Sequence, residues 1–372
     1  MNRIDQVIER LNAVARKPGK ATRELKASGK RLVGMFPIYT PDEIVIAAGA
    51  IPIGLWGAAT NISRARTYLQ PFACSIMQSI LELELNGSYD ILDAVIIPGL
   101  CDTLKCMGQK WKGKCPSICI THPQNRVIEA ANTYLVKEYE QCIAKLEKIL
   151  KVRITDEALA EAIEICNANR SALNNFARAA AQHPEVITPT IRHNVFKSRY
   201  FMEKQEHTKL VNELTDELNQ MPVIPWSGKK VILTGITCEP EALLDILSEM
   251  NIAVVADDLA QESRQTRTLV PLSSDKPIYN LAKMWQNIEG CSLAGDMQKK
   301  HGPMLIKMVD DSKADAVIVC MMKFCDPEEF DYAIYNAQLE KANIKYTMID
   351  IDQEATAFEQ IRTRLQSLAE IL

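Results

Sequence analysis

The sequence predicts an α/β fold made of two doubly wound, Rossmann- or flavodoxin-like domains that are bridged by a helical segment. The first observation behind this prediction is a strand–helix–strand pattern that occurs near residue 30 and again near residue 230. The two copies keep equal register, since Pro41 follows Gly29 and Pro240 follows Gly228 by 12 residues in both. An internal duplication explains this register, and convergence of two generic α/β units is the alternative.

The second observation is an apolar run that opens with Asp-Ala-Val-Ile and occurs once in each half. The first copy starts at Asp93 and leads to Cys101, and the second starts at Asp315 and leads to Cys325. Continuous apolar runs of this kind are typical of strands buried on both faces. An Asp follows each cysteine and indicates the start of a helix. The sequence therefore predicts one cysteine at a strand carboxyl end in each domain, where doubly wound sheets form their sites.

The first domain is expected over residues 1–125. It begins with one or two polar surface helices and continues as strand, helix and strand, over residues 2–28, 31–36, 41–50 and 51–56. The helix start is predicted from Thr40 as N-cap and Pro41 at the first helical position, because Thr accepts backbone hydrogen bonds there and Pro has a fitting φ.

The bridging segment is expected over residues 126–225 and the second domain over residues 226–372. The bridge carries apolar residues at three- and four-residue spacing, which predicts helices over residues 127–152, 156–183 and 195–220 and a linker over 221–225. The second domain is predicted to form a strand, a helix, a further strand, a last strand and a closing helix, over residues 231–234, 240–250, 252–255, 345–351 and from about 354.

The composition is that of a soluble globular protein. Apolar residues make up 47% and charged residues 24% of the 372 residues, and the formal net charge of -4 favours neither nucleic acid nor an anionic membrane as partner. No apolar stretch is long enough to span a bilayer, and the charged N-terminus lacks a signal-peptide core, so we expect a cytoplasmic protein. The 11 cysteines are an odd number and argue against a disulfide framework.

Three cysteines are the candidate metal ligands. Cys74, Cys101 and Cys325 each precede an expected helix, whose N–H groups and dipole are expected to lower a thiol pKa and to donate to bound sulfur. Their spacing lacks the paired CxxC pattern of zinc ribbons. It is compatible with an iron–sulfur cluster that leaves one iron for a non-protein ligand. No catalytic residue can be assigned from the sequence.

Other interpretations of the cysteines stay open. A rival ligand set clustered in sequence would be Cys101, Cys106, Cys115 and Cys119. Cys291 is a possible counterpart of Cys74 in the second half. Otherwise the cysteines are small buried residues, as we expect for Cys142, Cys166, Cys238 and Cys320.

Two polar segments at expected strand ends also allow two interpretations each. The run from His122 to Arg126 either faces a crevice or forms a loop that starts a helix. The run from Asp257 to Arg264 either orients a ligand or braces a domain interface. No glycine-rich phosphate loop and no metal-binding histidine spacing occurs, so the sequence does not support a nucleotide or a flavin.

Several motifs together resemble one family, the β subunits of the (R)-2-hydroxyacyl-CoA dehydratases, which form the 2-hydroxyglutaryl-CoA dehydratase D-component family. The resemblance covers nearly the whole chain. Within the family, the chain looks closest to the lactoyl-CoA and 2-hydroxyisocaproyl-CoA dehydratases. The residues that carry it are Phe72-Ala73-Cys74-Ser75, Cys101-Asp102-Thr103-Leu104 and Phe324-Cys325-Asp326-Pro327-Glu328-Glu329.

The resemblance implies a function. This subunit would hold a 4Fe-4S cluster on Cys74, Cys101 and Cys325 and relay one electron. A homologous α subunit would bind the acyl-CoA, and an ATP-dependent iron–sulfur activator would supply the electron. Addition of that electron to the thioester would give a ketyl radical, which expels the α hydroxyl and leads to the (E)-2-enoyl-CoA. The alternative is a stand-alone iron–sulfur electron-transfer or reductase protein of the same superfamily.

Overall fold

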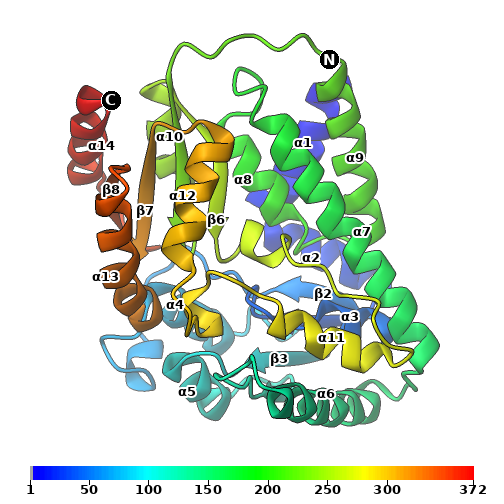
Figure 1. Cartoon of the computed structure of the whole chain (residues 1–372). Helices are drawn as coiled ribbons and strands as arrows, with labels where there is room; N and C mark the ends of the chain where they lie inside the picture. The colour runs from blue at the N-terminus through cyan, green and yellow to red at the C-terminus, as the bar shows by residue number, and fades with distance from the viewer. Residues whose placement is uncertain (1–2) are drawn as a thin grey trace.

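The computed structural model describes residues 3–372 and contains two four-stranded parallel sheets with helices packed on their faces (Figure 1). This arrangement confirms the predicted α/β class with two Rossmann- or flavodoxin-like domains. The domain limits given above stay a prediction.

The two sheets have the same strand order. The first has the order β2-β1-β3-β4 and the second has β6-β5-β7-β8, which is the flavodoxin-like order counted from the first strand of each sheet. All pairs are parallel. The bounds are β1 Leu32–Met35, β2 Ile51–Gly54, β3 Ala94–Pro98, β4 Ser117–Ile120, β5 Lys229–Gly235, β6 Ile252–Leu259, β7 Ala316–Met322 and β8 Lys345–Ile351.

The central strands β3 and β7 contain the repeated Asp-Ala-Val-Ile runs. Every residue of both strands is buried, which explains why their sequences are apolar without alternation. Asp93 and Asp315 lie just before them and accept backbone hydrogen bonds from Leu32 and Lys230 at the start of the neighbouring strands. The repeat therefore positions the central strand of each sheet.

Helices of the two α/β halves connect the strands and cover the sheets. In the first half they are α3 Asp42–Ala47, α4 Ser75–Leu85 and α5 Asp102–Lys110, with a 3-10 turn η1 at Ala65–Thr67. In the second half they are α10 Glu241–Glu249, α11 Pro277–Gln286, α12 His301–Ser312, α13 Asp326–Lys341 and α14 Glu359–Ile371, with 3-10 turns η2 at Ser263–Gln265 and η3 at Ser292–Ala294.

The remaining helices lie at the N-terminus and between the two α/β halves in sequence. They are α1 Arg3–Arg16, α2 Pro18–Ala27, α6 Glu129–Leu150, α7 Asp156–Ala180, α8 Pro189–Ser198 and α9 Lys204–Gln220. Two of them, α2 and α6, pack against the core of the sheets. Helices α1, α7, α8 and α9 share an apolar core of their own (Figure 1). The stretch expected to be one helix over residues 195–220 is instead the end of α8 and the whole of α9, so that prediction was wrong.

The predicted cap of the helix after β1 was also wrong. Pro41 is the N-cap of α3, and the Thr40 hydroxyl donates instead to the Phe36 carbonyl at 2.7 Å. The helix ends at Ala47 rather than at residue 50. Thr40 thus stabilises the turn that leaves β1 and does not cap the helix.

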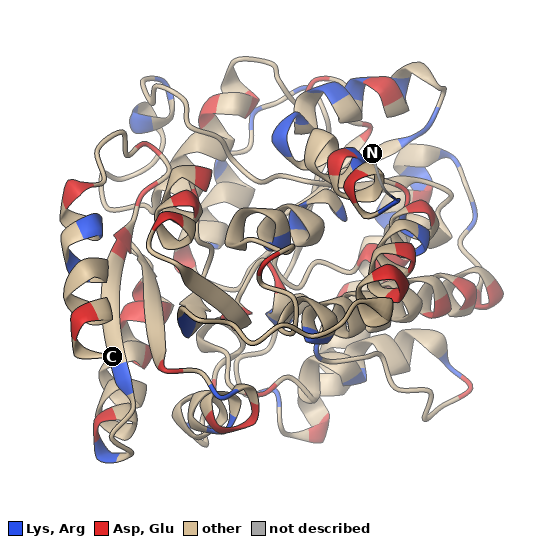
Figure 2. Ribbon diagram, turned by 90° about the horizontal axis from the view of Figure 1, so that it is seen from above, with Lys and Arg blue, Asp and Glu red and all other residues tan. Residues whose placement is uncertain are grey.

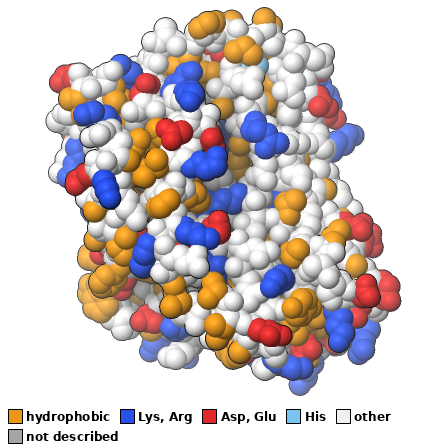
Figure 3. Space-filling view, viewed as in Figure 1, with side chains coloured by type: hydrophobic (Ala, Val, Ile, Leu, Met, Phe, Trp, Pro, Cys, Tyr) orange, Lys and Arg blue, Asp and Glu red, His pale blue; other side chains and the backbone are white. Residues whose placement is uncertain are grey.

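One apolar core joins the two sheets. It contains strand residues of both halves, among them Val33, Ile96, Leu233 and Ile318. Within residues 3–372, no helix is both long and apolar enough to cross a membrane. Basic and acidic side chains are interspersed along the outer helices and on the face drawn in space-filling form (Figures 2 and 3).

Candidate functional site

The site is built on three cysteines, each of which is the N-cap of a helix. Cys74 caps α4, Cys101 caps α5 and Cys325 caps α13. Cys101 lies three residues after the last residue of β3, and Cys325 lies three residues after the last residue of β7. The carboxyl end of the central strand therefore positions one cysteine in each half, Cys101 in the first and Cys325 in the second.

The residue after Cys74 attaches α4 to the second sheet. The Ser75 hydroxyl accepts a hydrogen bond from the Gln353 backbone N–H at 3.1 Å and lies 3.4 Å from the Met322 sulfur at the end of β7. Figure 1 shows the start of α13 beside α4 in agreement with these contacts. This contact between the halves brings Cys74 toward Cys325, although 251 residues of chain separate them.

The three thiols lie within electrostatic reach of one another. Burial raises the pKa of Cys74 to about 12, and the neighbouring Cys101 and Asp326 raise it as well. Burial also raises the pKa of Cys325 well above its usual value, with further contributions from Glu328, Cys74 and Cys101. The three cysteines, far apart in the sequence, therefore lie in one region of the fold.

Backbone N–H groups of the capped helices point at these sulfurs. Those of Met77 and Glu328 lower the pKa of Cys74 and Cys325, and those of Leu104 and Thr103 do so for Cys101. Burial is the larger effect at all three, so the expectation of lowered thiol pKa values was wrong. Free thiols here stay protonated at neutral pH, and a metal would have to displace their protons.

The cluster lies near the surface. Cys74 and Cys101 are half-buried and Cys325 is 8% exposed. Phe72 and Phe324, which are close to these cysteines in sequence, are 65% and 50% exposed. A group bound by the three thiols would therefore be reachable from outside the chain.

A buried ion-pair network supports the first turn of α13. Glu328 accepts hydrogen bonds from Arg264 at 2.5 Å and from the Ser292 hydroxyl at 2.6 Å. Arg264 also bonds Asp258 at 2.9 Å, and His301 joins Asp258 at 2.7 Å to Asp331 at 2.5 Å. The network links the end of β6 to α12 and α13 and holds the helix that carries Cys325.

These contacts decide between the two interpretations of the run from Asp257 to Arg264. Asp257 pairs with Arg192, and Glu262 pairs with Arg192 at 3.2 Å and with His193 at 2.8 Å. Since Arg192 and His193 lie on α8, the run braces the interface between the second sheet and this helix.

The segment from His122 to Arg126 is also part of an interface. His122 is buried against the Trp285 ring, with 4.7 Å between ring centroids. Burial lowers the pKa of His122 to about 4, so this imidazole is neutral at neutral pH. Arg126 donates to the carbonyls of Ala294 and Gln286, both at 2.8 Å, and ties η3 and α11 to the first half.

Cys291, Cys106 and Cys119 belong to the alternative ligand sets. Cys291 is buried and accepts a hydrogen bond from the Tyr39 hydroxyl at 3.0 Å, with Arg264 at 3.7 Å. Cys119 is exposed on β4 and Cys106 is half-buried within α5. The contact between Tyr39, Cys291 and Arg264 was missed by the sequence reasoning, because nothing in the sequence relates residue 39 to residue 291.

The donor set fits an iron–sulfur cluster in its chemistry. Thiolates are the usual protein ligands of such clusters, and N–H groups that donate to sulfur stabilise their negative charge. Three thiols at three helix N-termini supply both features. Among residues 3–372, no group of three His, Cys, Asp or Glu side chains is close enough together to bind a single metal ion.

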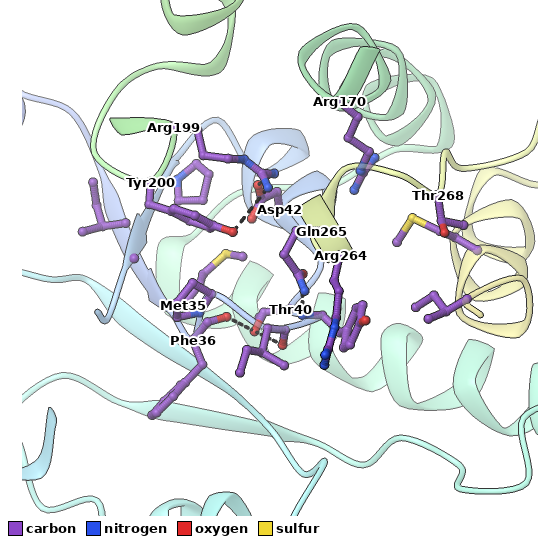
Figure 4. Close-up of a pocket in the computed structure, with 18 residues that line it drawn as sticks. Met35, Phe36, Thr40, Asp42, Arg170, Arg199, Tyr200, Arg264, Gln265 and Thr268 are labelled. Carbon is purple, nitrogen blue, oxygen red and sulfur yellow. Dashed lines mark hydrogen bonds and ion pairs between the residues drawn. The ribbon is translucent and has the colours of Figure 1, made fainter. Parts of the chain in front are cut away.

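A second candidate site is a cavity of about 30 Å³ at the carboxyl ends of β1 and β2 (Figure 4). The charged and aromatic residues that line it are Phe36, Tyr39, Asp42, Arg170, Arg199, Tyr200 and Arg264. The three capping cysteines are not part of this lining.

Known proteins are similar to this chain over its whole length. The family model described as 2-hydroxyglutaryl-CoA dehydratase, D-component, matches residues 37–372. The chain is 52% identical to the lactoyl-CoA dehydratase subunit beta of Anaerotignum propionicum and 43% identical to the (R)-phenyllactyl-CoA dehydratase beta subunit of Clostridium sporogenes, with 100% of each chain covered. It is 34% identical to the (R)-2-hydroxyglutaryl-CoA dehydratase subunit beta of Acidaminococcus fermentans, over 99% of this chain and 100% of that one.

Proposed function

Because this chain belongs to the 2-hydroxyglutaryl-CoA dehydratase D-component family, we propose that it is the β subunit of an (R)-2-hydroxyacyl-CoA dehydratase. The complex is a hydro-lyase that removes water from an (R)-2-hydroxyacyl-CoA and gives the (E)-2-enoyl-CoA. The observation that supports this subunit's part in it is the cluster of three helix-capping thiols formed by both halves of the chain.

The reaction explains why thiols rather than an acid–base pair would be the functional groups. The hydroxyl leaves from the α carbon, whereas the proton leaves from the β carbon, where a thioester does not make it acidic. Simple acid–base elimination is therefore mismatched to this substrate. A one-electron path through a ketyl radical removes the mismatch, and it requires a redox group in the complex.

In this proposal, Cys74, Cys101 and Cys325 hold a 4Fe-4S cluster. When bound, the cluster would accept one electron and pass it toward the substrate. The N–H groups at the starts of α4, α5 and α13 stabilise negative charge on the ligating sulfurs. The Arg264–Glu328 pair keeps the α13 helix start in position beside Cys325. Three thiols would leave one iron of such a cluster without a protein thiol.

The acyl-CoA is proposed to bind in a homologous α subunit. The relatives named above are beta subunits, which supports a partner subunit as the place of substrate chemistry. An ATP-dependent iron–sulfur activator and a cytoplasmic location complete the proposal.

Loss of any one of the three cysteines tests the site. The chain and its α subunit are produced together without oxygen, and iron and sulfide are measured per β subunit. We expect this chain to add about four iron and four sulfide ions to those of the α subunit. The Cys101→Ala and Cys325→Ala variants should lose them. Cys142→Ala, which alters a buried cysteine of α6, should keep both.

The complex is then assayed with lactoyl-CoA and longer 2-hydroxyacyl-CoAs in the presence of the activator. Dehydration is expected with the Cys142→Ala complex and not with the other two. A wild-type chain that takes up no iron after anaerobic reconstitution contradicts the cluster. Turnover by this chain without an α subunit contradicts the β-subunit role and favours the stand-alone alternative.

A further inference from the structure

The turn that leads from β7 to Cys325 contains a strained residue. The Cys325 N–H donates to the Met322 carbonyl at 3.1 Å, and Phe324, the third residue of this turn, has a φ of +62°. Glycine and asparagine are the usual residues at such a position, because a Cβ crowds the backbone in the left-handed region. A bulky aromatic residue there is a conformational outlier, and such outliers gather at functional sites.

The Phe324 ring gains little packing that would offset this strain. It is 50% exposed and does not belong to the apolar cores formed by the described residues. The backbone around it is held firmly, since the Phe324 N–H donates to Glu329 Oε1 at 3.2 Å and the Glu329 N–H donates to the Cys325 carbonyl at 2.9 Å. Neither the conformation of the turn nor the core of the protein explains a phenylalanine at this position.

The first half of the chain offers a direct comparison. Leu100 lies two residues after β3 and one before Cys101, as Phe324 lies two residues after β7 and one before Cys325. Leu100 is 3% exposed, belongs to the apolar core and has no positive φ. At the same place in the same fold, one half thus buries an aliphatic residue, and the other exposes an aromatic residue at a conformational cost.

Exposed phenylalanines occur close to the capping cysteines. Of the eight phenylalanines in the chain, Phe72, Phe324 and Phe330 are 65%, 50% and 80% exposed, and the other five are buried or partly buried. Phe72 lies two residues before Cys74, and Phe324 directly precedes Cys325. Since these two cysteines lie in one region of the fold, aromatic surface from both halves of the chain borders the place where a bound group would lie.

We propose that the Phe324 ring shields the labile iron of the cluster and slows its loss to solvent. This inference rests on the proposed function, because it assigns the ring to a cluster held by Cys74, Cys101 and Cys325. The iron without a protein thiol is the one most open to water and chelators, and the thiols lie near the surface. An apolar shell around a metal site limits the access of solvent to it. The strained turn places such a side chain directly beside Cys325.

The lifetime of the reconstituted cluster in the full chain tests the shielding role without an enzyme assay. Wild type and Phe324→Gly are reconstituted without oxygen, bathophenanthroline disulfonate is added with a reductant, and the formation of its iron(II) complex is followed. We expect about four iron per chain in both, and an iron loss about 10-fold faster in Phe324→Gly, as for other residues around a metal site. Glycine adopts a positive φ without strain, so the variant should fold, and its melting temperature before reconstitution checks this. Phe324→Asn, which also tolerates this φ, is a second variant with the same expected result.

Two control variants separate shielding from other effects. Phe324→Leu keeps an apolar side chain and should lose iron about as slowly as the wild type. Phe330→Ala removes a more exposed ring that lies more than one turn along α13, and it should also match the wild type.

The outcomes distinguish this inference from the proposed function. Equal rates of iron loss from loaded wild type and loaded Phe324→Gly overturn the shielding role and leave the cluster itself intact. Weaker binding of the α subunit by Phe324→Gly, with an unchanged rate of iron loss, also overturns it and assigns the ring to the subunit interface. A wild-type chain that takes up no cluster contradicts the proposed function.

Discussion

At the scale of single residues, the sequence revealed the chemistry of the side chains and not their partners. The polar run that begins at the end of β6 was visible, but its partners Arg192, His193, His301 and Glu328 lie on other helices, 43 to 70 residues away in the sequence. Whether such a run binds a ligand or braces an interface depends on those partners. The structure supplies them, and they are cations and a carboxylate of the protein itself.

Arg264 provides a residue-scale prediction, because it is fully buried between Asp258 and Glu328. Arg264→Met leaves both carboxylates without this cation, so we expect the free energy of unfolding to fall by about 3–5 kcal/mol. Urea denaturation measures the change. Arg362→Met, which removes a partly exposed partner of Glu249, should cost less than about 1 kcal/mol. Equal losses for the two variants would contradict the role of the buried network.

His193 predicts a dependence of stability on pH. Burial alone would lower its pKa, but hydrogen bonds to Glu239 and Glu262 raise the pKa to about 9. Since an unfolded histidine titrates near pH 6.5, the stabilisation from protonated His193 is complete below about pH 6.5 and is lost as pH rises through about 9. We expect the melting temperature of His193→Gln to depend less on pH in this window than that of the wild type.

The control for this experiment is His207→Gln. Burial lowers the pKa of His207 to about 3, so this imidazole is neutral in the folded chain above pH 6.5 and contributes no proton linkage there. The His207→Gln variant should be less stable than the wild type, but its melting temperature should depend on pH as that of the wild type does. His301, whose pKa is also raised to about 9, accounts for a slope that remains in His193→Gln. Identical slopes in His193→Gln and the wild type would refute the assignment.

At the scale of helices and strands, the spacing of apolar residues predicted well which elements exist and whether each is a helix or a strand. It predicted the boundaries of these elements less well. Residues 345–351 were predicted as a strand and form β8. The break between α8 and α9 was missed because Phe201 and Met202 are apolar and buried, so the helical spacing runs on through it. The cause of the break is tertiary: the Lys204 ammonium donates to the Arg199 carbonyl at 3.0 Å and pairs with Asp42.

Gly235 at the end of β5 gives a prediction at this scale. Its φ of +136° disfavours other residues, and a Cβ there would lie 2.2 Å from the Cys320 carbonyl oxygen of β7. Gly235→Ala therefore pushes neighbouring strands apart, and we expect a loss of at least about 2 kcal/mol in the free energy of unfolding. Chemical denaturation measures it. Gly19→Ala in α2, where φ is ordinary for a helix, should be neutral or stabilising.

At the scale of the whole molecule, both halves depend on one core. The shared apolar cluster and the hydrogen bond from the Trp56 indole to Glu239, at 2.7 Å, join the first half to the second. We expect one cooperative unfolding transition in spite of the length of the chain, with tryptophan fluorescence and far-UV circular dichroism changing together. Agreement between calorimetric and van't Hoff enthalpies checks this. Two separated transitions would show that the halves unfold independently.

The approach of the three capping cysteines to one another also depends on the whole molecule. The sequence predicted that Cys101 and Cys325 follow equivalent strands, because the repeat sets their register. It could not predict how the two sheets face each other, which depends on contacts such as that of Ser75 with Met322. The raised pKa values of Cys74, Cys101 and Cys325 were missed for the same reason, since burial is produced by packing between the halves.

The identical strand order of the two sheets has a consequence for the history of the molecule. A half-length ancestor with one such sheet could have paired with its own copy about a twofold axis, and every substitution would then have appeared on both sides. Fusion into one chain ends that constraint, because each half can change alone. An odd number of thiols, two from one half and one from the other, becomes accessible only after such a fusion.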